Sequence, residues 1–525
     1  MVSLYLGTPK VKRRACSDVM WASSPNFDDV IITIMVVETP VAGAAAPEEL
    51  SRRRRVGILL ICSMSLLIVG IDVTIVNVAL PSIGRDFHAS LSGLQWTVDA
   101  YTLVLASLLM ISGSTADRLG RRRTFVIGLI TFAAGSLLCS LAPNLDTLIV
   151  FRMVQAVGGS MLNPVAMSII TNTFTIPRER AQAVGIWGAV VGVSLALGPV
   201  VGGVLVTSIG WRSIFYLNIP IALAAAVLAL RYIPESKAAV ARKVDVPGQL
   251  LVIAFLASLT YSIIEGPEKG FSSSIIIGTC AVAVVSLVTF LIWERRATEP
   301  LIDLRFFRSV PFASATVIAV SAFAALGGFL FLNTLYLQDV RGLSALQAGL
   351  DTLPMAVMTM LVSPISGRVV GLRGARIPLL VAGVALTGSC LLLVGLSATT
   401  PFTWLFTAYV VFGIGFGFVN APITNTAVSG MPRSQAGVAS AIASTSRQIG
   451  STLGVAVVGA LVSSSLSKGN HLDFAVASRA GWWVLAGCGA VVLLLGLVAT
   501  TAWARGTAQR TAEAINPEFL ETHAA

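Results

Sequence analysis

The sequence predicts an all-α integral membrane protein with about fourteen transmembrane helices. Of its 525 residues, 55% are hydrophobic and 12% are charged, and the mean hydropathy is +0.85. A soluble chain carries about 25% charged residues, so this composition excludes an ordinary soluble domain. Apolar runs of about the 20 residues that span a bilayer recur along the chain. Lipid offers no hydrogen bonds to an open backbone, so we expect each run to be helical.

The first 51 residues precede the apolar runs. Their longest apolar stretch, residues 30–37, is too short to span a membrane, and no signal-peptide cleavage pattern follows it. We expect a disordered cytoplasmic lead over residues 1–51. The segment after Met35 resembles an ordinary short lead, which leaves Met35 open as the start of translation.

Fourteen apolar runs follow the lead in chain order. Six form a predicted N-terminal half over residues 52–233: 56–80, 94–115, 124–142, 147–170, 182–206 and 213–233. Two lie in a predicted insertion over residues 234–300: 247–265 and 275–293. Six form a predicted C-terminal half over residues 301–505: 312–338, 345–367, 376–397, 402–428, 436–464 and 481–503. The run at 402–428 contains Pro422 and is expected to kink there, and residues 506–525 form a predicted cytoplasmic tail.

Lys and Arg in the loops predict the orientation. One set of alternating loops holds 24 basic residues and the opposite set holds 6. The side richer in Lys and Arg is usually cytoplasmic. We therefore expect a protein of the plasma membrane with both termini in the cytoplasm. The excess of Arg over Lys and the abundance of Ala and Val indicate a bacterial source.

Several kinds of chemistry are excluded by what the sequence lacks. The six cysteines are scattered without metal-ligand spacing, and the three histidines lie in loops or the tail. No G-x-x-x-x-G-K-[ST] motif occurs, so the chain by itself is not an ATP-driven pump. Basic residues confined to particular loops do not suggest nucleic acid. We expect no enzyme activity, metal or cofactor.

A weak internal repeat relates the two predicted halves. The glycine-spaced loop at residues 113–122 recurs at residues 367–376, and the Gly-x-x-x-x-Pro of residues 159–164 recurs at residues 417–422. Repeated six-helix halves are typical of secondary transporters, which handle their substrate at the interface between the repeats.

Four segments carry recognisable motifs. They read Gly113-Ser-Thr-Ala-Asp117-Arg118-Leu-Gly120-Arg121-Arg122-Arg123, Ile71-Asp72-Val-Thr74-Ile-Val-Asn77-Val-Ala-Leu-Pro81, Arg152-Met-Val-Gln155-Ala-Val-Gly158-Gly159, and a glycine-rich helix with Gly185, Gly198, Pro199, Gly202 and Gly203. The first resembles the signature loop between helices 2 and 3 of the major facilitator superfamily. The others resemble the helix 1, helix 4 and antiporter motifs of its fourteen-helix drug:proton antiporters. The chain departs from these motifs at Thr115, Ala156 and Ser194.

The resemblance covers residues 52–505 and implies a function. It implies a proton-driven exporter of drugs or other small amphipathic or cationic compounds, which needs no ATP and works as a monomer in the bilayer. Two other hypotheses stay open. One is an exporter dedicated to a single endogenous metabolite, lipid or siderophore, and the other is a membrane sensor that does not transport.

Asp72 is the most informative residue for coupling. It lies 17 residues beyond Arg55, which places it well inside the membrane. An intramembrane carboxylate costs about 2.5–3.5 kcal/mol and is therefore usually functional. Because burial penalises its charged form, we expect Asp72 to bind and release a proton or a cation. The alternative is a structural carboxylate that accepts hydrogen bonds from hydroxyls such as Thr74.

Two further ionisable residues lie at a similar predicted depth. Asp99 and Arg152 are expected about one turn inside the outer ends of their helices. A buried Arg152 needs a carboxylate partner, and both Asp72 and Asp99 are candidates. Protonation would break such a pair and couple proton binding to movement, although a static ion pair is the alternative. Asp351 and Arg447 also fall inside predicted helices.

Residues 113–123, here named the latch loop, combine glycines with charge. Glycines permit a tight turn, and Asp117 can meet a helix N-terminus or an arginine. The resemblance implies that this loop holds the two halves together, with a partner for Asp117 near the start of the run at 436–464. The alternative is that Arg118 and Arg121 merely anchor the loop in the cytoplasm.

The glycine-rich run at 182–206 and a set of aromatic residues complete the predictions. Small residues allow close helix packing in lipid, and the resemblance places this run at the contact between the halves and associates it with export. Packing alone is the alternative. The hypothesis for eight aromatic residues is that they line a cavity for flat apolar substrates, and the alternative is that they face lipid or pack within the bundle: Phe323, Phe329, Phe331, Tyr336, Tyr409, Phe412, Phe416 and Phe418.

Overall fold

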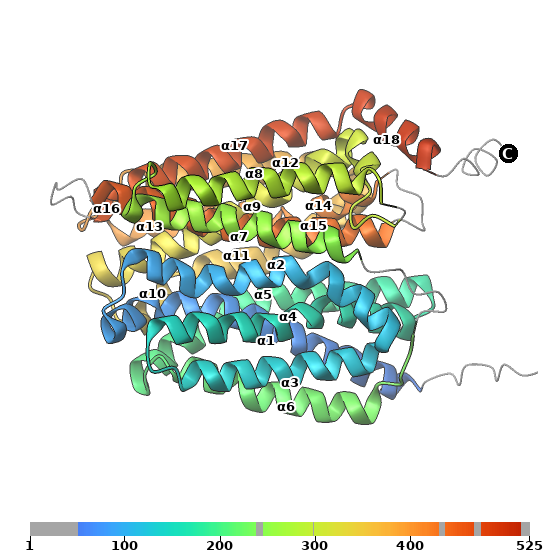
Figure 1. The fold of residues 1–525 in the computed structure, drawn as a ribbon, viewed down its shortest axis with the longest axis horizontal. Coiled ribbons are helices and arrows are strands. Elements are labelled where there is room, and N and C mark those ends of the chain that lie inside the picture. Colours follow the sequence, from blue (N-terminus) through green and yellow to red (C-terminus); the bar gives the residue numbers. More distant parts are fainter. Residues whose placement is uncertain (1–50, 238–244, 298, 430–435, 467–473, 516–525) are drawn as a thin grey trace, which may run out of the picture. The chain divides into compact units, whose positions relative to one another are not determined.

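The computed structural model describes residues 51–237, 245–297, 299–429, 436–466 and 474–515. Nearly all of the predicted lead, including Met35, lies outside these residues. The described residues form helices joined by short loops, without strands, and fourteen spans are long and apolar enough to cross a membrane (Figure 1). This result confirms the predicted fold class.

The first six spans are single helices, here named the N-terminal group. They are α1 (Arg52–Phe87), α2 (Leu91–Leu119), α3 (Arg121–Ser140), α4 (Leu145–Thr173), α5 (Pro177–Ser208) and α6 (Ser213–Tyr232). Polar caps set several of their starts. Ser90 accepts from the backbone N–H of Gly93, and Asn144 and Thr147 form a reciprocal capping box.

The next two spans form a helical hairpin, α7 (Val246–Lys269) and α8 (Ser274–Glu294). The C-terminal group follows with η1 (Leu304–Arg308), α9 (Val310–Leu335), η2 (Tyr336–Val340), α10 (Ala345–Asp351), α11 (Leu353–Arg373), α12 (Arg376–Leu393), α13 (Phe402–Gly417), α14 (Asn420–Val428), α15 (Ala436–Leu466), α16 (Phe474–Ala477) and α17 (Arg479–Ala499). Two predicted continuous runs are each divided. The run at 345–367 breaks at Thr352, and the run at 402–428 breaks at Phe418 and Val419, one turn before Pro422.

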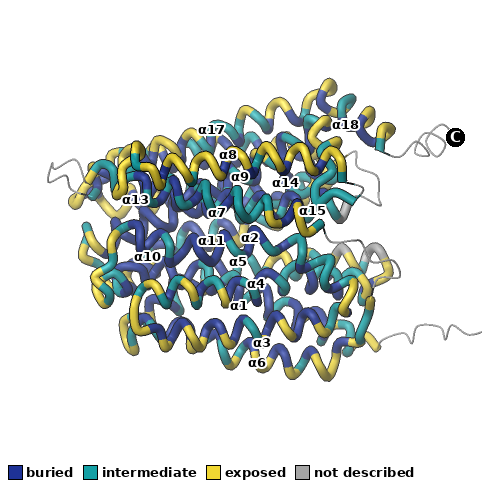
Figure 2. The backbone as a smooth tube through the Cα atoms, in the orientation of Figure 1, coloured by how far each residue is buried: buried dark blue, intermediate teal, exposed yellow. Residues whose placement is uncertain are grey.

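Packing defines three sets of neighbours. In the N-terminal group, α3 packs on α4 and α6, and α1 packs on α4, α5 and α6. In the C-terminal group, α9 packs on α15 and α17, and α12 on α13 and α17. The groups meet along two seams: α2 contacts α15, and α5 contacts α10 and α11. The hairpin covers the first seam, because α7 contacts both α2 and α15, while α8 stays largely exposed (Figure 2).

The predicted polar tail contains a further helix, α18 (Ala502–Ile515). One face of α18 buries Ala504, Ala508, Thr511 and Ala512, and the helix contacts α9 and η1. Small residues at helical spacing allow this close approach. Residues 506–515 of the predicted cytoplasmic tail are therefore part of a helix, its cytoplasmic location stays a prediction, and residues 516–525 lie outside the described chain.

Candidate functional site

A buried ion pair joins Asp72 of α1 to Arg152 of α4. Arg152 Nη1 lies 2.5 Å from Asp72 Oδ2, and the side chains are 1% and 0% exposed, respectively. The guanidinium also lies over the ring of Tyr101, 4.1 Å from its centroid, and its Nε donates to the backbone oxygen of Thr97. Two charges removed from water are stable only when paired and hydrogen-bonded. Asp72 is thus the carboxylate that Arg152 was predicted to need.

Three neutral side chains surround this pair. Gln155 Nε2 and Asn218 Nδ2 each donate to Asp72 Oδ1 at 2.8 Å, and both also donate to Ser136 Oγ. The network therefore draws on α1, α3, α4 and α6 and lies within the N-terminal group. Thr74 does not belong to it, since its hydroxyl donates to the backbone oxygens of its own helix turn. The alternative of a carboxylate capped by Thr74 is wrong.

The sequence analysis assigned no role to these three polar residues. Gln155 follows Arg152 by three positions and so shares its helix face, which is a usable signal. Asn218 is a polar residue in the otherwise apolar α6, and its burial could have indicated an interior partner. Ser136 offered no signal, because serines are common in membrane helices.

Asp99 of α2 lies apart from the ion pair. It is fully buried, and neither carboxylate oxygen has a hydrogen-bond partner among the described residues. Gln95 and Thr102 share its helix face and bond to α15: Gln95 Nε2 donates to the Ala456 oxygen at 2.9 Å, and Thr102 Oγ1 accepts from Thr452 at 2.8 Å. Asp99 therefore lies on the seam with α15 and is not the partner of Arg152. It lies eight residues after the start of α2, about two turns rather than the predicted one.

The latch loop turns tightly at Gly120, whose φ is +110°. Arg121 Nη2 lies 3.0 Å from Asp117 Oδ1, one turn away across the junction of α2 and α3. The predicted partner region at the start of α15 is only partly described, because residues 430–435 lie outside the described chain. Of the remaining residues of the latch loop, a Cβ on Gly113 would lie 4.0 Å from Pro164 Cβ, and Arg118 lies in the last turn of α2.

A partner of the latch loop that the sequence analysis missed is Glu235. Its carboxylate accepts from the backbone N–H groups of Arg122 and Arg123 at 3.1 and 3.2 Å, the first turn of α3. A carboxylate at a helix N-terminus is stabilised by the unpaired N–H groups there. A Cβ on Gly120 would lie 2.7 Å from the Glu235 carboxyl carbon. The backbone conformation at Gly120 therefore favours glycine, and a larger side chain there would displace the Glu235 carboxylate.

The glycine-rich motif lies on both faces of α5. Gly198 packs against the Thr74 side chain and Gly202 against Ile75, both of α1. A Cβ on Gly203 would lie 2.6 Å from Leu346 Cα of α10. A Cβ on Gly349 of α10 would likewise overlap the backbone oxygen of Pro199. The motif thus lies between α1 and the C-terminal group, except for Gly185, where an added Cβ would meet no described residue within 4 Å.

Asp351 and Arg447 lie on different helices and do not pair. Asp351 is the last residue of α10, next to the break at Thr352. Arg447 of α15 donates to Ser444 Oγ at 3.2 Å and to Thr424 Oγ1 at 2.7 Å. In the part of the chain that is described, Arg447 has no ion-pair partner.

The two helix groups are also bonded to each other near one end. Gln338 Nε2 of η2 donates to the Val78 oxygen of α1 at 2.8 Å, and Arg85 Nη1 lies 3.8 Å from Asp339 Oδ1. These bonds, like the one from Gln95 to α15, lie in the predicted outer half of the bundle. The described bundle is therefore closed at the predicted outer end.

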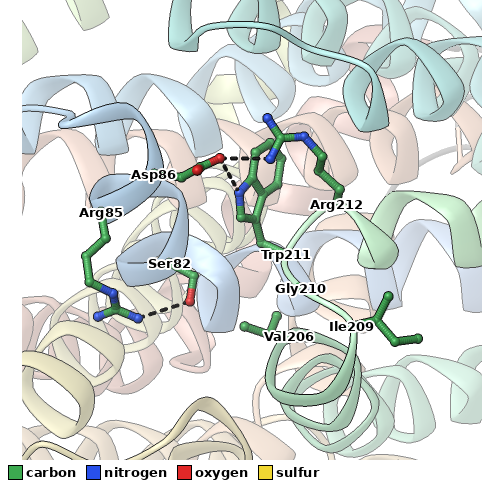
Figure 3. Close-up of a pocket in the computed structure, with 8 residues that line it drawn as sticks. All are labelled: Ser82, Arg85, Asp86, Val206, Ile209, Gly210, Trp211 and Arg212. Atoms are coloured by element: carbon green, nitrogen blue, oxygen red, sulfur yellow. Dashed lines mark hydrogen bonds and ion pairs between the residues drawn. The ribbon is translucent and has the colours of Figure 1, made fainter.

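A surface pocket of about 500 Å³ lies at this same end. Asp86 Oδ2 accepts from Trp211 Nε1 at 3.0 Å and from Arg212 Nη1 at 2.8 Å, which ties the end of α1 to the loop between α5 and α6 (Figure 3). Val206 and Ile209 add apolar walls. The bonded Asp86, Trp211 and Arg212 stabilise the end of the N-terminal group.

The predicted aromatic cavity lining is a packed cluster. Phe329 stacks on Phe412 with ring centroids 4.3 Å apart and meets the edges of Tyr409 and Trp482. These four side chains are fully buried. Phe323 and Phe418, which are only partly buried, are exceptions. For the buried members the packing alternative is correct.

Comparison with known proteins identifies the family of this chain. Residues 62–455 match the family described as Major Facilitator Superfamily. The chain is 38% identical over 425 residues to "Multidrug resistance protein Stp" of Mycobacterium tuberculosis (strain CDC 1551 / Oshkosh), covering 80% of this chain and 78% of the relative. It is 37% identical over 432 residues to "Tetracenomycin C resistance and export protein" of Streptomyces glaucescens, covering 82% of this chain and 78% of the relative. A solved D-xylose-proton symporter has a similar fold, with a TM-score of 0.60, 15% identity and coverage of 84% of this chain and 97% of its own. The chain is a multi-pass membrane protein that belongs to the major facilitator superfamily.

Proposed function

We propose that this chain is a proton-coupled antiporter that exports drugs and other small amphipathic or cationic compounds across a bacterial plasma membrane. Both termini lie in the cytoplasm in this proposal, and neither ATP nor a cofactor takes part. The relatives, which are named for multidrug resistance and for export of tetracenomycin C, support the substrate class. The observation that carries proton coupling is the buried pair of Asp72 and Arg152.

The pair provides a direct coupling step. When a proton binds the Asp72 carboxylate, the negative charge that stabilises Arg152 is lost. Arg152 then keeps only neutral acceptors, Gln155 Oε1 and the Thr97 oxygen. An unpaired cation in this environment is costly, so the helices that hold it shift until it is solvated or paired again. A membrane potential supplies about 2.3 kcal/mol per proton per 100 mV for this cycle.

The contacts of α1 offer a route for this movement. Thr74 and Ile75 follow Asp72 within one turn and pack on Gly198 and Gly202 of α5. The other side of α5 packs on α10 through Gly203. We infer that a shift of α1 reaches the C-terminal group through α5 and opens the bonded outer end. This is alternating access of two six-helix halves around a central site.

A single-substrate exporter is the second candidate. The relative named for one compound, tetracenomycin C, favours it. Resistance to a panel of unrelated compounds, measured in a host without its own pumps, separates the two. Protection against several chemical classes supports the first proposal, and export of one native metabolite alone supports the second.

Proton coupling is tested in proteoliposomes with the purified protein. Addition of an exported compound is expected to move protons across the vesicle membrane in the direction opposite to the movement of the compound. Collapse of the pH gradient with a protonophore should stop uphill movement. Uphill export that continues without any ion gradient contradicts the proposal.

A further inference from the structure

A second pocket lies between the hairpin and the seam that it covers. Its volume is about 160 Å³, and side chains of α2, α7, α8 and α15 line it together with the segment after α8. Met110, Leu256 and Phe290 are among its apolar walls. Gln249 lies in the first turn of α7, which starts on the predicted cytoplasmic side, so the pocket is in the inner half of the predicted membrane. It touches both helix groups and the hairpin at once.

Two polar atoms of this lining lack a partner. Gln249 and Thr445 are 3% and 7% exposed. Gln249 Nε2 donates to the Ser107 backbone oxygen, but Gln249 Oε1 and Thr445 Oγ1 have no hydrogen-bond partner among the described residues. A buried polar atom left unpaired costs about 1–3 kcal/mol. A ligand that supplies a partner would therefore gain from both atoms.

Size and charge restrict this ligand. An apolar cavity of about 150 Å³ in another protein accepts one benzene molecule, so the pocket fits a single six-membered ring. None of the residues that line it is ionisable, and an unpaired ion would be costly there. Gln249 Oε1 can only accept a hydrogen bond, whereas the Thr445 hydroxyl can donate or accept one. A ligand group that both donates and accepts hydrogen bonds can therefore pair with either atom. A neutral hydroxyl on a ring satisfies all three conditions.

We propose that this pocket is a binding site for a neutral phenol-like ring, its hydroxyl bonded to Gln249 or Thr445 and its ring held between the hairpin and the two helix groups. The proposal rests on the pocket alone and does not depend on transport activity.

The test measures binding of para-fluorophenol and fluorobenzene by fluorine NMR, with the protein in lipid nanodiscs. The two probes have the same ring and differ by the hydroxyl. Wild type is expected to bind para-fluorophenol about fivefold more tightly than fluorobenzene, the effect of one net hydrogen bond. Thr445→Val keeps the shape of the side chain. It should reduce or abolish the preference for para-fluorophenol without weakening the binding of fluorobenzene. Gln249→Leu provides the same measurement for the amide.

A filled pocket is the second arm. Ala106 lines the pocket, and Ala106→Phe should abolish binding of both probes. The matched control is Ala281→Phe on the exposed surface of α8, which should bind both probes like wild type. Thermal unfolding of both variants shows that they are folded. Equal binding of both probes in all variants means partition into lipid only, and tighter binding of fluorobenzene means an acyl-chain groove. Either result, or the absence of binding to wild type, overturns the proposal.

Discussion

At the scale of single residues, the site depends on how Asp72 is held. Its two carboxylate oxygens accept from Arg152, Gln155 and Asn218. This arrangement suits a static ion pair as well as a proton switch, because both require a fully bonded carboxylate in the resting state. The two roles differ in what happens when the side chain can no longer titrate.

Asp72→Asn is expected to abolish uphill efflux and substrate-induced proton release, while the protein still reaches the membrane. Neutral compounds should still bind, and cationic ones should bind more weakly if Asp72 also serves as their counter-ion. The change leaves Arg152 without its counter-charge, which costs about 3–5 kcal/mol when a buried pair is broken. Thermal unfolding in detergent should therefore begin at a lower temperature. Transport and unfolding are measured on the same preparation.

The double variant Asp72→Asn with Arg152→Gln separates stability from coupling. It removes both charges and should regain most of the lost thermal stability, yet it should not pump. Asp146→Asn, an exposed acid in the first turn of α4, is the control and should transport normally. Normal uphill efflux by Asp72→Asn would show that Asp72 is structural, and the coupling role would then move to Asp99 or Asp351.

At the scale of helices and loops, close approach is the common feature. On α5, glycines meet α1 on one side and α10 on the other. The latch loop meets Glu235, which follows α6. In both places a backbone comes so near to its neighbour that a side chain has no room.

Gly203→Val is expected to separate α5 from α10 and to reduce transport at least tenfold. A branched side chain would overlap Leu346, and forced overpacking typically costs about 1–3 kcal/mol. Efflux rate and thermal unfolding check this. Gly185→Val, on the same helix but with open space around its Cβ position, should leave both quantities near their wild-type values. If the two variants behave alike, the contact with α10 is not what matters at Gly203.

Asp117→Asn is expected to slow transport severalfold while folding and substrate binding stay intact. The variant removes the charge that pairs with Arg121 at the junction of α2 and α3, far from the buried network. The transport rate at saturating substrate is compared between the variant and wild type. Ligand binding is compared in the same two proteins under conditions without transport. Glu268→Gln, an exposed acid at the end of α7, is the control. A wild-type rate for Asp117→Asn would contradict the latch role.

The helices were predictable from the sequence, and of their two interruptions the one near Pro422 was expected as a kink while the one at Thr352 was not. Apolar length alone predicts a span, so all fourteen were found. The break at Phe418 lies four residues before Pro422, and the break at Thr352 lies two residues before Pro354. Proline lacks a backbone N–H and clashes with the carbonyl four residues earlier. Asp72 and Arg152 could be paired because charges in lipid need partners. Glu235 could not, since an acid in a loop has many possible partners and only the fold brings it to the start of α3.

At the scale of the whole bundle, the outer end is bonded and the groups meet along two seams. Gln95 fills the space beside Gly459 on one of them, where a Cβ on Gly459 would lie 2.8 Å from Gln95 Cγ. A cysteine places its sulfur where glutamine has Cγ. This separation suits the short reach of a disulfide bond.

Gln95→Cys combined with Gly459→Cys is therefore expected to form a disulfide on oxidation and to lock the seam between α2 and α15. Transport should stop in the oxidised protein and return with a reductant. Oxidised wild type and the single variant Gln95→Cys are controls for the native cysteines. Disulfide formation is quantified by the mobility of a protease-nicked sample on a gel. Full transport by the cross-linked protein would show that this seam does not open.

The buried network has a consequence for inheritance. Every side chain bonded to Asp72 comes from α4 or α6, so the residues of the proposed proton switch lie within one contiguous stretch of the gene. A recombination that exchanged the sequence from α9 onward would leave that network unchanged and would replace the whole C-terminal group, including its contacts with α1, α2, α5 and α7. Under the proposed function, related chains can therefore exchange the C-terminal group by recombination. The ion pair of Asp72 and Arg152 and its hydrogen bonds are then inherited together.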